Sequence, residues 1–196
     1  MVKRFLTTAV ALIAAAGISF GAQIATFTGP QDPSQLNASL NTLVASINSS
    51  VGALGAGTVA ASTTATTVES TLQSYTLPPG ALSAAGQAIR ASCWGTTGAN
   101  ANNKTMKLYF GSSVVTTPTA ATNNGTWLLR MVVLRKTATT QGFMGDGLVN
   151  TTAVAPSVTD GAETLANGIL IKCTGTNGTA SASDITANGL LVEGIR

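Results

Sequence analysis

Residues 126–136 read TWLLRMVVLRK, and runs of this kind decide the fold of the chain. Similar short β-type runs recur from about Thr71 to the C-terminus, separated by clusters of glycine, proline and asparagine. Asparagine and glycine tolerate the positive φ angles of tight turns, so these clusters predict the chain reversals. The other candidate strands are LQSYTL (72–77), AIRASCWG (88–95), TMKLYFG (105–111), GLVNTTAV (147–154), GILIKCTG (168–175) and ITANGLLVEGI (185–195).

This tract predicts a mainly β protein in which residues 71–196 form an antiparallel, jelly-roll-like β-sandwich with almost no helix. The number and spacing of the runs are typical of sandwiches, because such a chain must close its sheets to hide their edges. No strands alternate with helices, as a parallel sheet would require. The sandwich is therefore the expected C-terminal domain.

A short amphipathic helix is predicted for residues 31–51. Asp32 can cap its first turn, Pro33 suits the first helical position, and Gln35 completes a capping box. Apolar residues then follow at helical spacing and form one stripe that needs a partner, either the sandwich or other copies of the helix. The stripe consists of Leu36, Leu40, Leu43, Val44, Ile47 and Val51. Residues 52–70 are rich in glycine, alanine, serine and threonine and are predicted to be a linker.

The first 30 residues contain an apolar run, Phe5 to Phe20, preceded by Lys3 and Arg4. This arrangement is also typical of a secretory signal peptide, with Ala22 as the cleavage site. Phe20 would then occupy a position that normally holds a small residue, so we favour an apolar attachment arm over a signal. The predicted contacts with neighbouring subunits are Phe5, Leu6, Ile13, Ile18 and Phe20 of the arm and Leu36, Leu40, Leu43 and Ile47 of the helix.

The composition argues against catalysis and against nucleic-acid binding. The chain has no histidine, which removes the commonest general base and metal ligand, and its seven carboxylates are dispersed. A glycosidase built on two carboxylates remains formally open. The net charge of +3 forms no basic stripe. We therefore expect no enzyme activity, no metal, no cofactor, no small-molecule substrate, no nucleic acid and no membrane in the mature assembly.

Only 9% of the residues are charged, against about 25% in an ordinary soluble domain. Such a surface suits an assembly, and together with the helix stripe it predicts a homo-oligomer, with a trimer favoured.

The two cysteines and the large aromatic residues are expected to fill the core. Alternation within their strands points Cys93 and Cys173 inward, where buried free thiols are favoured over a disulfide between neighbouring strands. Trp94, Tyr109, Phe110 and Trp127 lie in strand runs, and core packing is favoured over a carbohydrate-binding platform. Residues 141–147, QGFMGDG, are expected to form a loop.

Residues 77–111, LPPGALSAAGQAIRASCWGTTGANANNKTMKLYFG, resemble a pattern of tailed-bacteriophage virion β-sandwich proteins, and Ala25–Leu36 resembles the N-terminal part of such proteins. The resemblance implies a head-decoration, head-fibre or tail-associated protein, commonly trimeric and without enzymatic activity. It transfers no functional residue.

The sequence thus predicts a structural protein located in a virion, favoured as a capsid decoration or head-fibre protein that binds the major capsid protein or neighbouring virion proteins through its arm. The alternatives are an exported adhesin or lectin-like sandwich with a cleaved signal peptide, and a phage tail or receptor-binding module.

Overall fold

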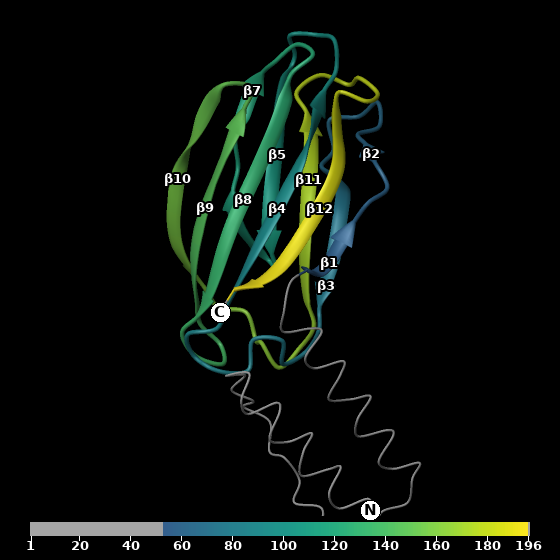
Figure 1. Cartoon of the computed structure of the whole chain (residues 1–196). Coiled ribbons are helices and arrows are strands. Elements are labelled where there is room, and N and C mark those ends of the chain that lie inside the picture. Colours follow the sequence, from purple (N-terminus) through teal and green to yellow (C-terminus); the bar gives the residue numbers. More distant parts are fainter. Residues whose placement is uncertain (1–52, 196) are drawn as a thin grey trace, which may run out of the picture. The chain divides into compact units, whose positions relative to one another are not determined.

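The computed structural model describes residues 53–195 of the chain, and these form two antiparallel sheets packed as a β-sandwich without any helix (Figure 1). The predicted arm (1–30), the predicted helix (31–51) and the contact residues proposed on them lie outside the described residues. Accordingly, no membrane-spanning helix is found within residues 53–195.

The larger sheet has seven strands in the order β1-β12-β4-β8-β9-β10, with β2 also paired to β12. Its strands are β1 (Ala53–Gly57), β2 (Ala61–Ser62), β4 (Ala88–Thr97), β8 (Thr126–Arg135), β9 (Gln141–Val149), β10 (Thr152–Gly161) and β12 (Ile185–Ile195). The smaller sheet has five strands in the order β3-β11-β5-β6, with β7 paired to β5. Its strands are β3 (Ser70–Leu77), β5 (Asn103–Phe110), β6 (Ser113–Thr116), β7 (Thr119–Ala121) and β11 (Ile169–Asn177).

The chain passes repeatedly from one sheet to the other, since β3, β4 and β5 alternate between the sheets and β10, β11 and β12 do the same. Figure 1 shows β10, β9, β8, β4 and β12 side by side, with β5 and β11 of the other sheet behind them. Six of the seven predicted runs each coincide with one strand to within two residues at either end, whereas GLVNTTAV spans parts of two strands. The prediction of a helix-free sandwich is confirmed for residues 71–195.

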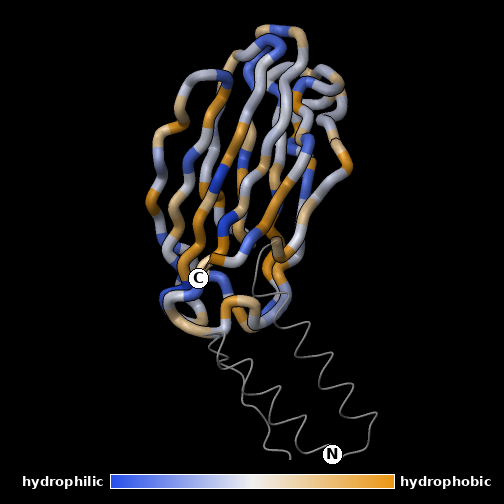
Figure 2. The backbone as a smooth tube through the Cα atoms, in the orientation of Figure 1, coloured by the Kyte–Doolittle hydropathy of each residue, from blue (hydrophilic) through white to orange (hydrophobic). Residues whose placement is uncertain are grey.

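The core lies between the sheets and follows the two-residue period of the strands. In β8, buried and more exposed residues alternate along the whole strand, and β4 and β5 repeat the pattern. Figure 2 shows apolar and polar positions following one another along these strands. The buried β8 residues are Trp127, Leu129, Met131 and Val133.

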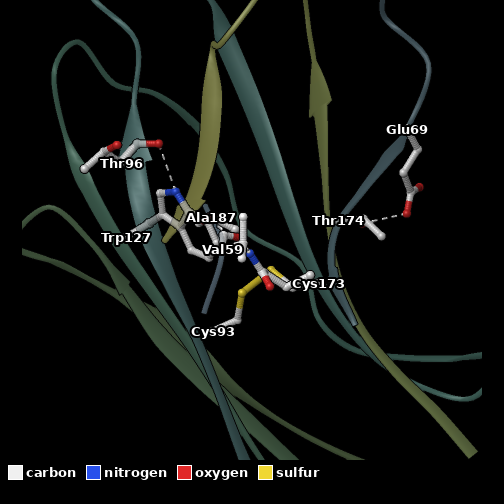
Figure 3. Close-up of a disulfide and its surroundings, with 9 residues drawn as sticks. Val59, Glu69, Cys93, Thr96, Trp127, Cys173, Thr174 and Ala187 are labelled. Carbon is white, nitrogen blue, oxygen red and sulfur yellow. Dashed lines mark hydrogen bonds between the residues drawn. A yellow bond between two sulfur atoms is a disulfide. The ribbon is translucent and has the colours of Figure 1, made fainter. Parts of the chain in front are cut away.

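A disulfide between Cys93 of β4 and Cys173 of β11 joins the two sheets through this core (Figure 3). Their Cα atoms are 6.5 Å apart and both residues are fully buried. Both cysteines point inward as predicted, but the expectation of free thiols was wrong. The alternative of a bond between neighbouring strands was also inexact, because β4 and β11 belong to different sheets. Alternation decides which face a cysteine occupies, whereas the stacking of the sheets decides what lies opposite.

Within the stretch predicted as a linker (52–70), β1 and β2 pair with β12 and belong to the larger sheet. The glycines that suggested a linker here allow a side chain of another strand to lie close to the β1 backbone. A Cβ atom on Gly55 would overlap the ring of Tyr75, whose hydroxyl donates a 2.8 Å hydrogen bond to the Leu54 carbonyl. The small side chains of β1 therefore make room for a bulky residue of β3.

A second correction concerns residues 141–147, which form most of strand β9 and not a loop. Phe143 is buried in the core and Met144 lies on the outer face, as alternation requires once the segment is a strand. The predicted run GLVNTTAV contains the end of β9, a turn and the start of β10. Asn150 occupies this turn with a φ of 54°.

Candidate functional site

The residues predicted to make subunit contacts lie outside the described range. Within residues 53–195, the outer faces of the two sheets carry the candidate surfaces. Two of the four large aromatic residues, Phe110 and Trp127, are buried as predicted. Trp94 is 41% exposed, and Tyr109 is half-buried on the outer face of the smaller sheet. The core prediction was therefore wrong for these two.

Trp94 lies on the outer face of the seven-stranded sheet because its neighbour Cys93 points inward. It pairs directly with Leu128 of β8, and Leu128 pairs with Leu148 of β9, so the three side chains form one row across the sheet. On the other side of β4, a Cβ atom on Gly189 of β12 would overlap the indole ring. This glycine allows the ring to lie close against the β12 backbone.

A shallow depression of about 300 Å³ begins at this row. Its lining contains Asn150 and Asn188, the threonines Thr96 and Thr126, and no charged side chain. Beneath it the buried Trp127 donates a 3.2 Å hydrogen bond from Nε1 to a main-chain carbonyl of β4 (Figure 3). We call this feature the Trp94 depression. Its chemistry is an aromatic surface surrounded by neutral hydrogen-bonding groups.

A second apolar group occupies the same outer face closer to strand β10. Met144 pairs with Val132 on one side and with Val158 on the other. Met144 is 47% exposed and Val158 is 81% exposed. Leu134, 43% exposed, extends the group along β8. We call these residues, Val132, Leu134, Met144 and Val158, the Met144 patch.

An ion pair lies between the two apolar features. Arg130 Nε donates a 2.7 Å hydrogen bond to Asp146 Oδ1, and both residues occupy the row between Leu128 and Val132. The outer face of the large sheet thus presents two distinct apolar surfaces.

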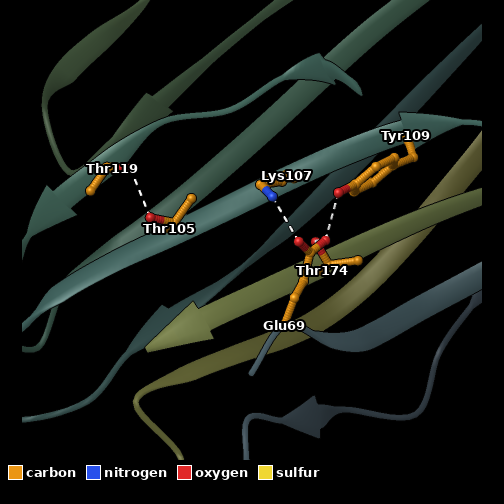
Figure 4. Close-up of polar contacts among 6 residues, drawn as sticks. All are labelled: Glu69, Thr105, Lys107, Tyr109, Thr119 and Thr174. Atoms are coloured by element: carbon orange, nitrogen blue, oxygen red, sulfur yellow. Dashed lines mark hydrogen bonds and ion pairs between the residues drawn. The ribbon is translucent and has the colours of Figure 1, made fainter. Parts of the chain in front are cut away.

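The smaller sheet carries a polar cluster around Glu69, which lies just before β3 (Figure 4). Lys107 Nζ, the Tyr109 hydroxyl and the Thr174 hydroxyl donate hydrogen bonds of 2.7, 2.6 and 2.7 Å to its carboxylate. Partial burial raises the pKa of Glu69, but these hydrogen bonds and the charge of Lys107 outweigh it and lower the pKa from 4.5 to about 2.

Tyr109 is enclosed further by Lys172, whose Nζ lies 4.6 Å from the ring centroid. Because the Glu69 carboxylate is ionised and already accepts three hydrogen bonds, it is a poor general base. The cluster ties the start of β3 to β5 and β11, which is a structural task.

A buried lysine holds the loops at one end of the sandwich. Lys104 is fully buried, and its Nζ donates to the carbonyls of Asn100, Asn102 and Thr122 and to Asn100 Oδ1, at 2.9 to 3.0 Å. The Asn100 amide in turn donates to buried Asp184. Lys104 was not predicted from the sequence to be buried, although the asparagines around it are a signal of local hydrogen-bond acceptors.

No cluster of three or more histidine, cysteine, aspartate or glutamate side chains that could hold a metal occurs in residues 53–195. The Trp94 depression, the Met144 patch and the Glu69 cluster are outward-facing features of this part of the chain.

Comparisons with known proteins identify no matching family model and no matching curated protein. Among solved structures, the chain is similar to the CBM2 module of the Lactobacillus casei BL23 phage J-1 evolved Dit, with 11% identity and a TM-score of 0.31, covering 61% of this chain and 67% of that one. A structure of infectious bursal disease virus, Gt strain, matches with 12% identity and a TM-score of 0.19, covering 74% of this chain and 41% of that one. At TM-scores below 0.5 neither similarity supports a conclusion about fold or function.

Proposed function

We propose that this chain is a non-enzymatic structural protein of a bacteriophage virion, a capsid decoration or head-fibre protein whose sandwich contacts neighbouring subunits. The observation that carries the proposal is the Met144 patch. Val158 and Met144 are exposed side by side on the outer face of the larger sheet, where contiguous apolar side chains commonly mark protein interfaces.

The energetics of such a contact favour a multi-copy assembly. Burying one large apolar side chain contributes about 1.5–3 kcal/mol, part of which offsets the loss of motional freedom on association. A single patch of this size therefore binds weakly, whereas repeated copies on a symmetric particle reinforce one another. A trimer is the oligomer we favour.

The second support is the sequence resemblance of residues 77–111 to virion β-sandwich proteins. Within the described structure this segment forms β4, β5 and the connections around them, which are central parts of the sandwich. The arm and helix predicted for residues 1–51 are the proposed attachment to the shell, and the major capsid protein is the proposed partner.

The inter-sheet disulfide is also consistent with this assignment. Disulfides persist in oxidising surroundings, which a released particle meets outside its host. A cross-link between the sheets keeps the sandwich closed there without help from ligands.

The test is made on the full-length protein and on purified particles. We expect the chain among the virion proteins detected by mass spectrometry, and light scattering is expected to give an oligomer at micromolar concentration. Val158→Asp is expected to lower the oligomer mass or the occupancy on particles, whereas the control Ser74→Asp, at an exposed position of the other sheet, is expected to change neither. Absence of the protein from particles would overturn the assignment.

A second candidate function is an exported adhesin or lectin-like protein. The basic and apolar start of the chain and the disulfide favour it, because export delivers proteins to an oxidising compartment. A mature N-terminus at Gln23 in cells, with no protein on particles, would support export. Localisation by labelled antibody on particles would separate the third candidate, a tail or receptor-binding module, from a head protein.

A further inference from the structure

We propose that the Trp94 depression binds a sugar ring of a neutral polysaccharide. The inference is independent of whether the protein belongs to a virion, because it depends only on the outer face of the seven-stranded sheet.

The first argument is the fixed position of the indole. β4 lies between β12 and β8, so the strand that carries Trp94 is hydrogen-bonded on both sides. The ring lies against the main chain at Gly189, where a side chain would collide with it. A preorganised ring loses little conformational freedom when a ligand stacks on it. Yet 41% of the residue remains exposed, so part of the ring is available to a ligand.

The second argument is the chemistry around the ring. The hydroxyls of Thr96 and Thr126, the side-chain amide of Asn188 and the Nδ2 group of Asn150 line or border the depression. None of these groups has a protein hydrogen-bond partner among residues 53–195, whereas Asn150 Oδ1 accepts a 2.9 Å bond from the Thr126 amide. That bond orients the Asn150 side chain and leaves its NH₂ group free to donate.

These features select the class of ligand. A pyranose ring has an apolar face of C–H groups that packs on an aromatic ring, and hydroxyls at its edge that exchange hydrogen bonds with amides and hydroxyls. The absence of charged side chains from the lining favours a neutral ligand over an anionic one. The volume of about 300 Å³ is at the small end of ligand sites, which suits one or two sugar residues of a longer chain.

The Met144 patch on the same sheet lacks these features, although it is also exposed and apolar. It has no aromatic ring, and the Arg130–Asp146 ion pair separates it from the depression. Exposed apolar side chains alone therefore do not reproduce the chemistry of the depression.

The experiment is affinity electrophoresis of the full-length protein in gels that contain laminarin, mannan, xylan or dextran, with anionic polygalacturonate as the charged comparison. We expect at least one neutral polysaccharide to retard the wild-type protein, and titration of that polysaccharide to change the fluorescence of Trp94. Trp94→Ala is expected to weaken binding at least 10-fold and Asn188→Ala about 3-fold. The control Leu170→Ala, which truncates an apolar residue of the smaller sheet that is also 41% exposed, is expected to leave binding unchanged. The thermal unfolding midpoints are compared to verify that each variant is folded.

The proposal would be overturned if no neutral polysaccharide retards the wild-type protein, or if wild type and Trp94→Ala are retarded equally. Retardation by polygalacturonate alone would also overturn it. If Trp94→Ala reduces the oligomer mass in light scattering while no polysaccharide binds, the depression is a contact between copies of the chain and the sugar site is refuted.

Discussion

Removing the disulfide between Cys93 and Cys173 is expected to destabilise the sandwich strongly. The two cysteines are 80 residues apart in the chain, and a cross-link of this span restricts the unfolded state. The chain-entropy model assigns it roughly 4.5 kcal/mol at 25 °C, within the range of about 2–5 kcal/mol observed when native disulfides are removed. With a denaturant slope of about 2 kcal/mol per molar urea, the unfolding midpoint should fall by about 2 M.

The assay is equilibrium urea unfolding of the full-length chain, followed by the fluorescence of buried Trp127. Oxidised wild type is compared with wild type kept reduced after refolding, with Cys93→Ala and with the double variant Cys93→Ala/Cys173→Ala. Loss of the cross-link is complete in the single variant, so the single and double variants should be destabilised to a similar extent.

Two results would refute this reasoning. Equal midpoints for oxidised and reduced wild type would mean that the bond does not restrict the unfolded chain as calculated. A double variant that loses twice as much stability as the single variant would show that lost packing at each buried site, and not the cross-link, controls the effect.

Three further predictions concern stability and use the same urea assay. Lys104→Met should lower the free energy of unfolding by about 3 kcal/mol, because the buried ammonium donates to four oxygens that would lose their donor. An unchanged urea midpoint would show that water takes the place of the ammonium group. Glu69 has a pKa of about 2 in the fold against 4.5 unfolded, so its stabilisation is present above pH 4.5 and is lost as the pH falls toward 2. After allowance for solvent screening this amounts to about 1 kcal/mol, and Glu69→Gln should remove that part of the pH dependence. Gly55→Ala should lower the free energy of unfolding by about 2 kcal/mol, because the new Cβ would overlap the Tyr75 ring. The control Ala56→Ser, at the exposed next position, should leave the stability unchanged. Equal effects of the two substitutions would show that β1 does not pack on β3.

Local rules were sufficient for the strands and for the direction of many side chains. The inward direction of Cys93 followed from the strand period, and the same period requires Trp94 to point outward. Trp94 was nevertheless predicted to lie in the core, because large aromatic rings are usually buried. The glycine that receives the ring lies 95 positions later in the chain, at Gly189, and nothing local connects the two residues.

The candidate surfaces likewise depend on contacts between residues that are far apart in the chain. The Met144 patch depends on strands β8, β9 and β10 pairing in one register, which brings Val132 and Val158 beside Met144. The buried Lys104 looks in sequence like any solvated lysine of a strand. Only the folded loops supply the carbonyls of Asn100, Asn102 and Thr122 that make its burial favourable.

By itself the sequence determined the all-β character of residues 71–195, the approximate position of the seven principal runs and the inward direction of both cysteines, because the pleat and the turn residues act over a few neighbouring positions. The tertiary structure decided that residues 53–57 join the larger sheet, that the two cysteines face each other across the core, and that Trp94 borders a neutral depression. Each of these depends on which strands pair and how the two sheets stack. Those contacts join residues far apart in the chain, and their free energy is set by packing that no short stretch of sequence contains.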